Sequence, residues 1–163
     1  MLAEGIFMKR DKTLQPLSWQ HHDTLMACLM LEKGVKKNVE IKVLQDFTRH
    51  IWEKDINKHF LLEENYLVPH LRQKQFPEYI IRSLLNDHDL LRNVSARLFN
   101  GGASYQLFLS FANLLEQHVR FEERLVFEKA QEMIPEEELG KLARHFPTEH
   151  SSSCKDYPVK FWE

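Results

Sequence analysis

The 163-residue chain is 43% hydrophobic and 28% charged, a composition typical of one soluble globular domain. Its formal net charge of −2 gives no electrostatic reason to expect nucleic acid or an anionic membrane as a partner. Two cysteines do not make a disulfide framework, and no apolar run approaches the roughly 18–20 residues that cross a bilayer, so we expect a cytoplasmic protein.

Hydrophobic residues recur at helical spacing along most of the chain, whereas strand patterns are nearly absent. The leucines at 14, 17, 25 and 29 predict a first helix, which Gly34 is expected to end. Pro69 is expected to end the second helix, and the sequence "NGG" to end the third. The four long helices are therefore predicted over about residues 14–34, 39–67, 77–100 and 104–133.

Four long helices with short connections predict an all-α fold, an antiparallel up-down-up-down four-helix bundle. The stretch "IPEEELGKLARHF" has a proline followed by three glutamates, which predicts a short extra C-terminal helix. No linker of disordered composition divides the chain. We expect one bundle domain over residues 1–145 and a C-terminal tail over residues 146–163 that lies on the surface.

Nine histidines are the compositional anomaly, and each long helix places one on its apolar face. In the first helix His22 shares a face with Leu25 and Leu29, and His21 lies slightly round from it, so the two could exchange roles. In the third helix His88 lines up with the apolar positions.

The second and fourth helices repeat one unit, a histidine followed four residues later by a glutamate. In "HFLLEE" the pair is His59 and Glu63, and in "HVRFEE" it is His118 and Glu122. Positions four apart on a helix are neighbours, so each imidazole lies beside its carboxylate. A second glutamate follows each unit, and for the fourth helix Glu122 and Glu123 both remain candidates.

A lone histidine on an apolar face is more often a hydrogen-bonded core residue than a metal ligand. Six polar groups from four helices are harder to satisfy separately, because burying each without a partner costs roughly 1–3 kcal/mol. That sum rivals the stability of a domain. A pair of cations accepts all six groups at once, and imidazole with carboxylate suits iron or manganese, with zinc as a competitor.

Two other metal motifs are excluded by spacing. No histidine has a glutamate three residues before it, as the Glu-x-x-His unit of ferritin-like oxidases requires, and the zinc-peptidase motif HExxH is missing. In a dinuclear site each glutamate would bridge two ions and each ion would keep about two histidines. Such ions have fewer than six ligands, so a small molecule such as O2, NO or peroxide could bind.

The segments "LSWQHHDTL", "HFLLEENYLVP", "NDHDLLR" and "HVRFEERLVF" resemble the successive helices of the hemerythrin-like, HHE cation-binding family. The resemblance spans roughly residues 14–127. It implies an antiparallel four-helix bundle that holds two carboxylate-bridged, non-haem iron ions. Carried over by position, the implied metal ligands are His22, His59, Glu63, His88, His118 and Glu122.

Two departures distinguish the chain from the oxygen-carrying hemerythrins. Arg92 stands where those proteins have a second histidine, one turn beyond the ligand of the third helix. Those proteins also place an aspartate five residues after the last histidine, where this chain has Glu123. With four matched histidines the chain resembles the bacterial branch more closely, which includes proteins implicated in the nitric-oxide response and in repair of damaged iron–sulfur centres.

The function expected from these features is binding of O2 or NO at a di-iron centre for sensing, storage or stress response. One alternative is an enzyme that acts on NO or peroxide, or that donates iron for iron–sulfur cluster repair. A second alternative is a bundle in which the metal has only a structural role. The small molecule is the expected partner, without nucleic acid or membrane, and a homo-oligomer is compatible with the sequence.

Overall fold

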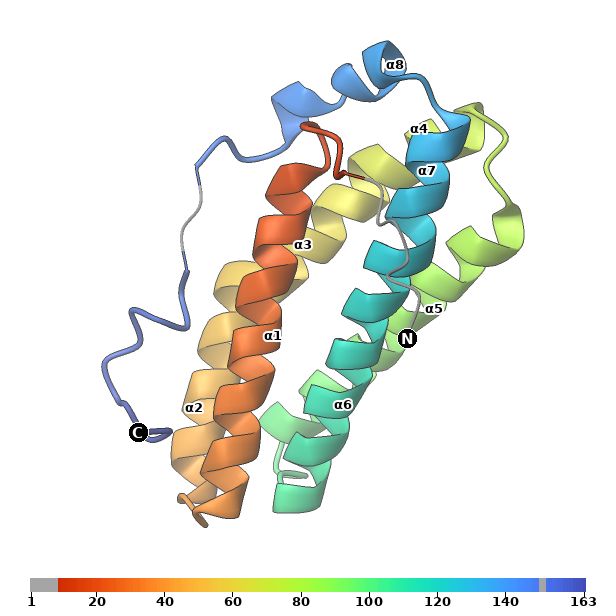
Figure 1. The fold of residues 1–163 in the computed structure, drawn as a ribbon. Coiled ribbons are helices and arrows are strands. Elements are labelled where there is room, and N and C mark those ends of the chain that lie inside the picture. The colour runs from red at the N-terminus through yellow and green to blue at the C-terminus, as the bar shows by residue number, and fades with distance from the viewer. Residues whose placement is uncertain (1–8, 150–151) are drawn as a thin grey trace, which may run out of the picture.

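A computed structural model describes residues 9–149 and 152–163, and these residues form helices and no strands. The predicted all-α class is confirmed for this part of the chain. The helices lie in four long rods, of which the second and fourth contain π-helical turns (Figure 1). In chain order the rods are α1 (Gln15–Lys36); α2 (Ile41–Ile51), η1 (Trp52–Ile56), α3 (Asn57–Leu62), η2 (Glu63–Leu67) and α4 (Val68–Gln73); α5 (Glu78–Phe99); and α6 (Tyr105–Phe121), η3 (Glu122–Val126) and α7 (Phe127–Met133).

Successive rods run in opposite directions in Figure 1, where α1 descends, α2 to α4 ascend, α5 descends and α6 to α7 ascend. Helix α1 packs against α2 and α6, and α5 packs against the same two helices. Two short elements, α8 (Glu136–Gly140) and the 3-10 turn η4 (Ala143–His145), follow within the predicted C-terminal stretch. No helix in the described ranges is long and apolar enough to cross a membrane.

Two of the predicted helix ends are wrong. Helix α1 continues past Gly34 to Lys36, and Gly34 is buried within it. Glycine is needed there because a Cβ would lie 2.6 Å from Leu44 and 2.9 Å from Phe161. The second rod continues past Pro69 to Gln73. Pro69 lies in the first turn of α4, directly after the π-helical turn η2, where a missing backbone N–H is tolerated.

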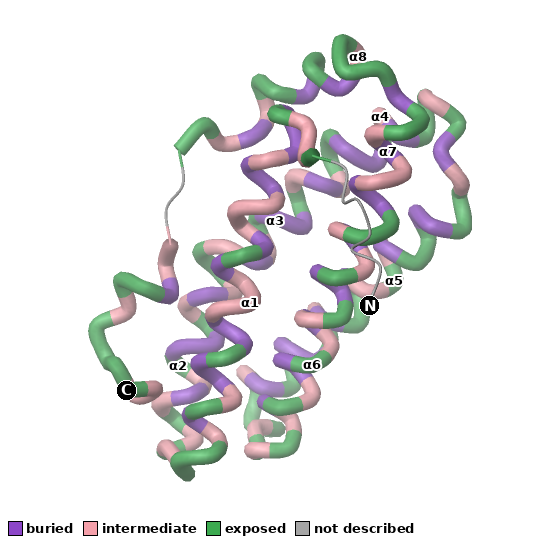
Figure 2. The backbone as a smooth tube through the Cα atoms, in the orientation of Figure 1, coloured by how far each residue is buried: buried purple, intermediate pink, exposed green. Residues whose placement is uncertain are grey.

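The buried apolar residues of the described part of the chain form two clusters at different heights of the rods. Figure 2 shows that buried segments recur along the rods. The first cluster includes Phe47, Phe108 and Phe111, and the second includes Leu14 and Phe127. On three of the rods the predicted site residues fall between the part that enters one cluster and the part that enters the other. On the second rod Glu63 does so, and His59 directly precedes Phe60, the last residue of that rod in the first cluster. The polar site is therefore a layer across the middle of the core.

The C-terminal tail contributes to the core rather than only lying on the surface. Cys154 is 1% exposed and belongs to the first apolar cluster. The rings of Phe161 and Trp162 lie 5.0 and 5.7 Å from the ring of Phe47 between centroids. The expectation that the tail lies only on the surface is wrong, because aromatic side chains in the tail bury apolar area against α2.

Candidate metal centre

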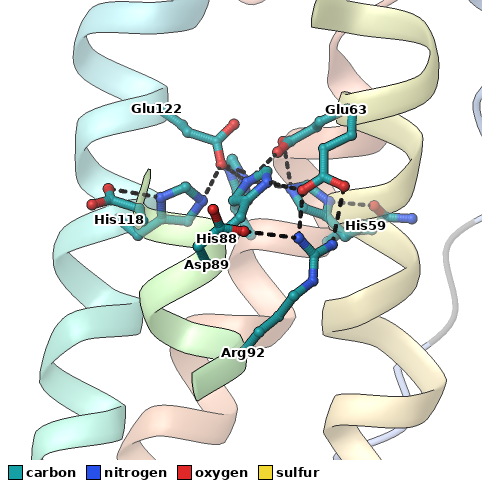
Figure 3. Close-up of polar contacts among 11 residues, drawn as sticks. His59, Glu63, His88, Asp89, Arg92, His118 and Glu122 are labelled. Carbon is teal, nitrogen blue, oxygen red and sulfur yellow. Dashed lines mark hydrogen bonds and ion pairs between the residues drawn. The ribbon is translucent and has the colours of Figure 1, made fainter. Parts of the chain in front are cut away.

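Six polar side chains from all four rods meet in the layer between the two apolar clusters. Each is at most 5% exposed to solvent. Figure 3 shows Glu63 and Glu122 approaching one another from separate rods, with His88 near them. The six residues are His21, His59, Glu63, His88, His118 and Glu122.

The structure brings together five of the six residues predicted from sequence, and corrects the sixth. His22 is exposed, whereas His21 is 3% exposed and lies in the cluster. The predicted buried face of this helix is wrong because it includes Leu29, which is 58% exposed. The buried face of α1 instead passes through Leu17, His21 and Cys28, at helical spacings of four and seven.

Each central carboxylate lies close to imidazoles of more than one rod. Glu63 places Oε1 2.7 Å from Nε2 of His59, and Oε2 3.1 Å from Nε2 of His88. Glu122 Oε1 lies 2.6 Å from Nε2 of His118 and 3.6 Å from Nε2 of His21. The donor atoms fall into two overlapping groups that share both glutamates: His21, His59, Glu63 and Glu122; and Glu63, His88, His118 and Glu122.

Short distances alone do not make hydrogen bonds, and here the geometry is unsuitable for them. Both oxygens of Glu63, both of Glu122, and Nε2 of His88 and His118 are buried without a hydrogen-bond partner among the described residues. Leaving such groups unsatisfied costs roughly 1–3 kcal/mol apiece, and more for a charge. Lone pairs that converge at unsuitable hydrogen-bond angles fit metal cations, so the residues present suit a two-ion site.

The opposite nitrogen of each imidazole has a separate partner on a neighbouring rod. In a neutral imidazole a proton on Nδ1 leaves the lone pair of Nε2 directed into the cluster. Partners of this kind orient metal-binding histidines. The four pairs through Nδ1 are His21 with Glu123 at 2.7 Å, His88 with Glu64 at 2.8 Å, His118 with Asp87 at 3.0 Å and His59 with Gln20 at 2.6 Å.

Two arginines hold the outer glutamates in place. Arg10 donates to Glu123 at 2.9 Å, and Arg92 donates to both oxygens of Glu64 at 2.7 and 3.1 Å (Figure 3). The sequence left open whether Glu122 or Glu123 belongs to the cluster, and the two side chains occupy different positions. Glu122 lies in the cluster and Glu123 is the outer partner of His21.

Sequence reasoning missed Gln20 and Asp87 as members of the site. A signal for them was available, since each directly precedes a buried histidine, in "QH" and "DH". Each binds the histidine of a neighbouring rod instead of the one beside it in sequence. That pairing depends on how the rods pack, which the spacing within one helix does not reveal.

Burial and the crowded charges shift the pKa values of the cluster in the metal-free chain. Burial and the neighbouring Glu122 raise the pKa of Glu63 well above its ordinary value. Burial would raise the pKa of Glu122 too, but His118 and His21 outweigh it and hold that pKa well below the ordinary value. Burial lowers the pKa of His118, yet Glu122 and Asp87 outweigh it and raise the pKa to about 9. In the metal-free chain, protons bound to Glu63 and His118 therefore offset part of the negative charge that a metal cation would otherwise balance.

Local helix geometry and aromatic packing fix the orientation of these side chains. The π-helical turns η2 and η3 begin at Glu63 and Glu122 respectively, and such turns are frequent at functional sites. The Phe60 ring stacks on His88 with centroids 3.9 Å apart and an angle of 11°. The Phe127 ring lies nearly parallel to His21 at 5.4 Å. These rings restrict rotation of the two imidazoles.

The fold and this donor set define an all-α protein with a site able to hold metal cations. The sequence pattern of the hemerythrin HHE cation binding domain matches residues 16–130, a range that contains all six clustered residues. The chain belongs to the hemerythrin HHE cation-binding domain family. Searches of curated proteins and of solved structures find no match.

Proposed function

We propose that the chain is a non-haem di-iron protein that binds a diatomic molecule, O2 or NO, for sensing, storage or stress response. Its four rods then form the antiparallel up-down-up-down bundle expected for the family. The observation that carries the proposal is the pair of donor groups that share Glu63 and Glu122. Two carboxylates common to both groups suit bridging of two ions rather than binding of one.

The proposed ligands of the first ion are His21 and His59, and those of the second are His88 and His118, with Glu63 and Glu122 shared. Imidazole and carboxylate without thiolate favour iron, with manganese or zinc as alternatives. Iron supplies the capacity to ligate O2 or NO. Two imidazoles and two shared carboxylates would supply each ion with fewer than six protein ligands, which would leave room for a diatomic ligand.

The protein's own residues orient and shield the site. Outer partners keep a proton on each Nδ1, so that every Nε2 presents its lone pair to the cluster. Apolar clusters on both sides exclude bulk water from the layer. Arg92 binds Glu64 and so supports His88 from outside, at the position where oxygen carriers have a further histidine. This difference supports a relationship to the bacterial branch.

The test is metal analysis of anaerobically purified protein, with optical spectra before and after addition of O2 and NO. We expect about two iron ions per chain and a reversible spectral change with one of the gases. Turnover of NO or peroxide, or iron transfer to an acceptor cluster, would instead identify the enzyme alternative. A zinc-filled site that does not respond to gases would identify the structural alternative.

The variant His59→Ala/His118→Ala is the control, because it removes one imidazole from each proposed ion position. We expect it to lose metal uptake while circular dichroism still reports a helical chain. Retention of two ions by this variant would show that the ligand assignment is wrong.

A further inference from the structure

The outer partners of the four histidines follow a twofold pattern. Glu64 and Glu123 each follow a shared carboxylate in sequence, and each contacts the histidine of a neighbouring rod. Gln20 and Asp87 occupy a second pair of equivalent positions, one residue before a buried histidine. They contact His59 and His118, the two histidines of the repeated His-x-x-x-Glu unit. The two members of this pair differ chemically, because Gln20 is an amide whereas Asp87 is a carboxylate.

The break makes the surroundings of the two ion positions differ in charge. The first position, His21 and His59, is backed by Glu123 and the neutral Gln20. The second position, His88 and His118, is backed by Glu64 and Asp87. Arg10 pairs with Glu123 and also with Glu128, and Arg92 pairs with Glu64 and also with Asp89, so the arginine and carboxylate charges outside Gln20 and Asp87 are matched between the two positions. The carboxylate of Asp87 therefore leaves one additional negative charge behind the second position.

A carboxylate that accepts the Nδ1 proton makes the imidazole a stronger base and a better metal ligand, and losing such a partner costs about 10–100-fold in metal affinity. A neutral amide gives less of this effect. Resting on the two-ion site proposed above, we infer that the two ions are held unequally and that Gln20 makes the first position the exchangeable one. Its ion leaves first and is replaced first, and the second ion leaves more slowly.

A cavity next to Gln20 supplies a route for this exchange. The cavity has a volume of about 630 Å³ and lies between the first and second rods and the segment after α8. Gln20 forms part of its wall and also accepts a hydrogen bond from His59 at 2.6 Å, so the side chain that backs the first position also lines the cavity. Among the charged residues that line this cavity, the carboxylates of Asp23, Asp55 and Glu149 outnumber the ammonium groups of Lys54 and Lys58, and an excess of carboxylates favours the approach of a divalent cation.

The test uses full-length protein loaded anaerobically with Fe²⁺ and then mixed with an excess of a colorimetric ferrous chelator. We expect wild-type protein to release iron in two phases of equal amplitude. Gln20→Glu adds the missing carboxylate and should slow the fast phase by about 10–100-fold. Asp87→Asn removes a carboxylate and should accelerate the slow phase by a similar factor. A merely structural disturbance would accelerate release in both variants, so the slowing by Gln20→Glu is the diagnostic result.

Asn86→Asp is the matched control, because it adds the same charge at an exposed position beside Asp87. We expect both phases to keep their wild-type rates in this variant. Release of both ions in one phase from wild-type protein would overturn the inference, as would an unchanged fast phase in Gln20→Glu. A response of Asn86→Asp equal to that of Gln20→Glu would assign the effect to long-range charge and overturn it too. Failure of wild-type protein to load two ions would instead contradict the proposed function.

Discussion

The Nε2 atoms of His21 and His59 lie 3.0 Å apart in the centre of the core. Their Nδ1 atoms face the Glu123 carboxylate and the Gln20 amide oxygen, which accept hydrogen bonds. Two neutral imidazoles would therefore direct lone pairs at one another. A cation between them removes this conflict. In the metal-free chain a proton can do so, since Glu122 and Glu123 outweigh burial and raise the pKa of His21.

The first prediction separates two adjacent histidines of α1. His21→Ala removes a buried imidazole of the first ion position and should cost that ion, leaving about one iron per chain. His22→Ala removes an exposed side chain and should keep both ions. Metal content after anaerobic purification measures the difference. The reverse result, with iron lost only from His22→Ala, would mean that α1 is rotated relative to the arrangement described.

The second prediction concerns protons released by metal uptake. In the metal-free chain His118 has a pKa of about 9, so at pH 7 it carries a proton that a metal ion must displace. Because metal binds the deprotonated form, apparent affinity should fall as the pH is lowered below about 9, and should level off above it. Titration with Zn²⁺ in weakly buffered solution containing a pH indicator measures the protons. Metal uptake at pH 7 without proton release would contradict this assignment.

The third prediction tests the aromatic support of the site. Phe60→Ala removes a ring that is 1% exposed and stacks on His88, and should lower the free energy of unfolding by about 3–5 kcal/mol. Leu61→Ala, at a neighbouring residue that is 43% exposed, should change it by less than about 0.5 kcal/mol. Urea unfolding of the metal-free proteins measures both. Equal effects in the two variants would show that Phe60 is not packed as described.

The fourth prediction concerns Gly34, where helix propensity and packing oppose one another. Alanine in a helix interior is favoured over glycine by about 1 kcal/mol. A Cβ at Gly34 would however displace Leu44 and Phe161, and such overpacking costs about 1–3 kcal/mol. Gly34→Ala should therefore be destabilising. Gly140→Ala, where a Cβ meets nothing within 4 Å, should not be. Thermal unfolding measures both, and a stabilised Gly34→Ala would show that the tail contact is dispensable.

The sequence alone predicted the helical class and most of the residues that cluster in the candidate site. Hydrophobic spacing within one helix predicts which face is buried, and a histidine four residues before a glutamate predicts that the pair shares that face. For this reason the sequence predicts that His59 lies beside Glu63, and that His118 lies beside Glu122. The predicted place of His88 followed from the same periodicity within α5.

Only the tertiary structure decided the features that depend on contacts between rods. Helix α1 carries leucines on more than one face, so its own pattern favoured His22, whereas packing against α2 and α6 buries His21. The outer partners Gln20 and Asp87 bind histidines of other rods, and no spacing along one helix encodes that pairing. Sequence periodicity fixes the direction of a side chain relative to its own helix axis, but the rotation of each helix against its neighbours is set by packing of the whole core.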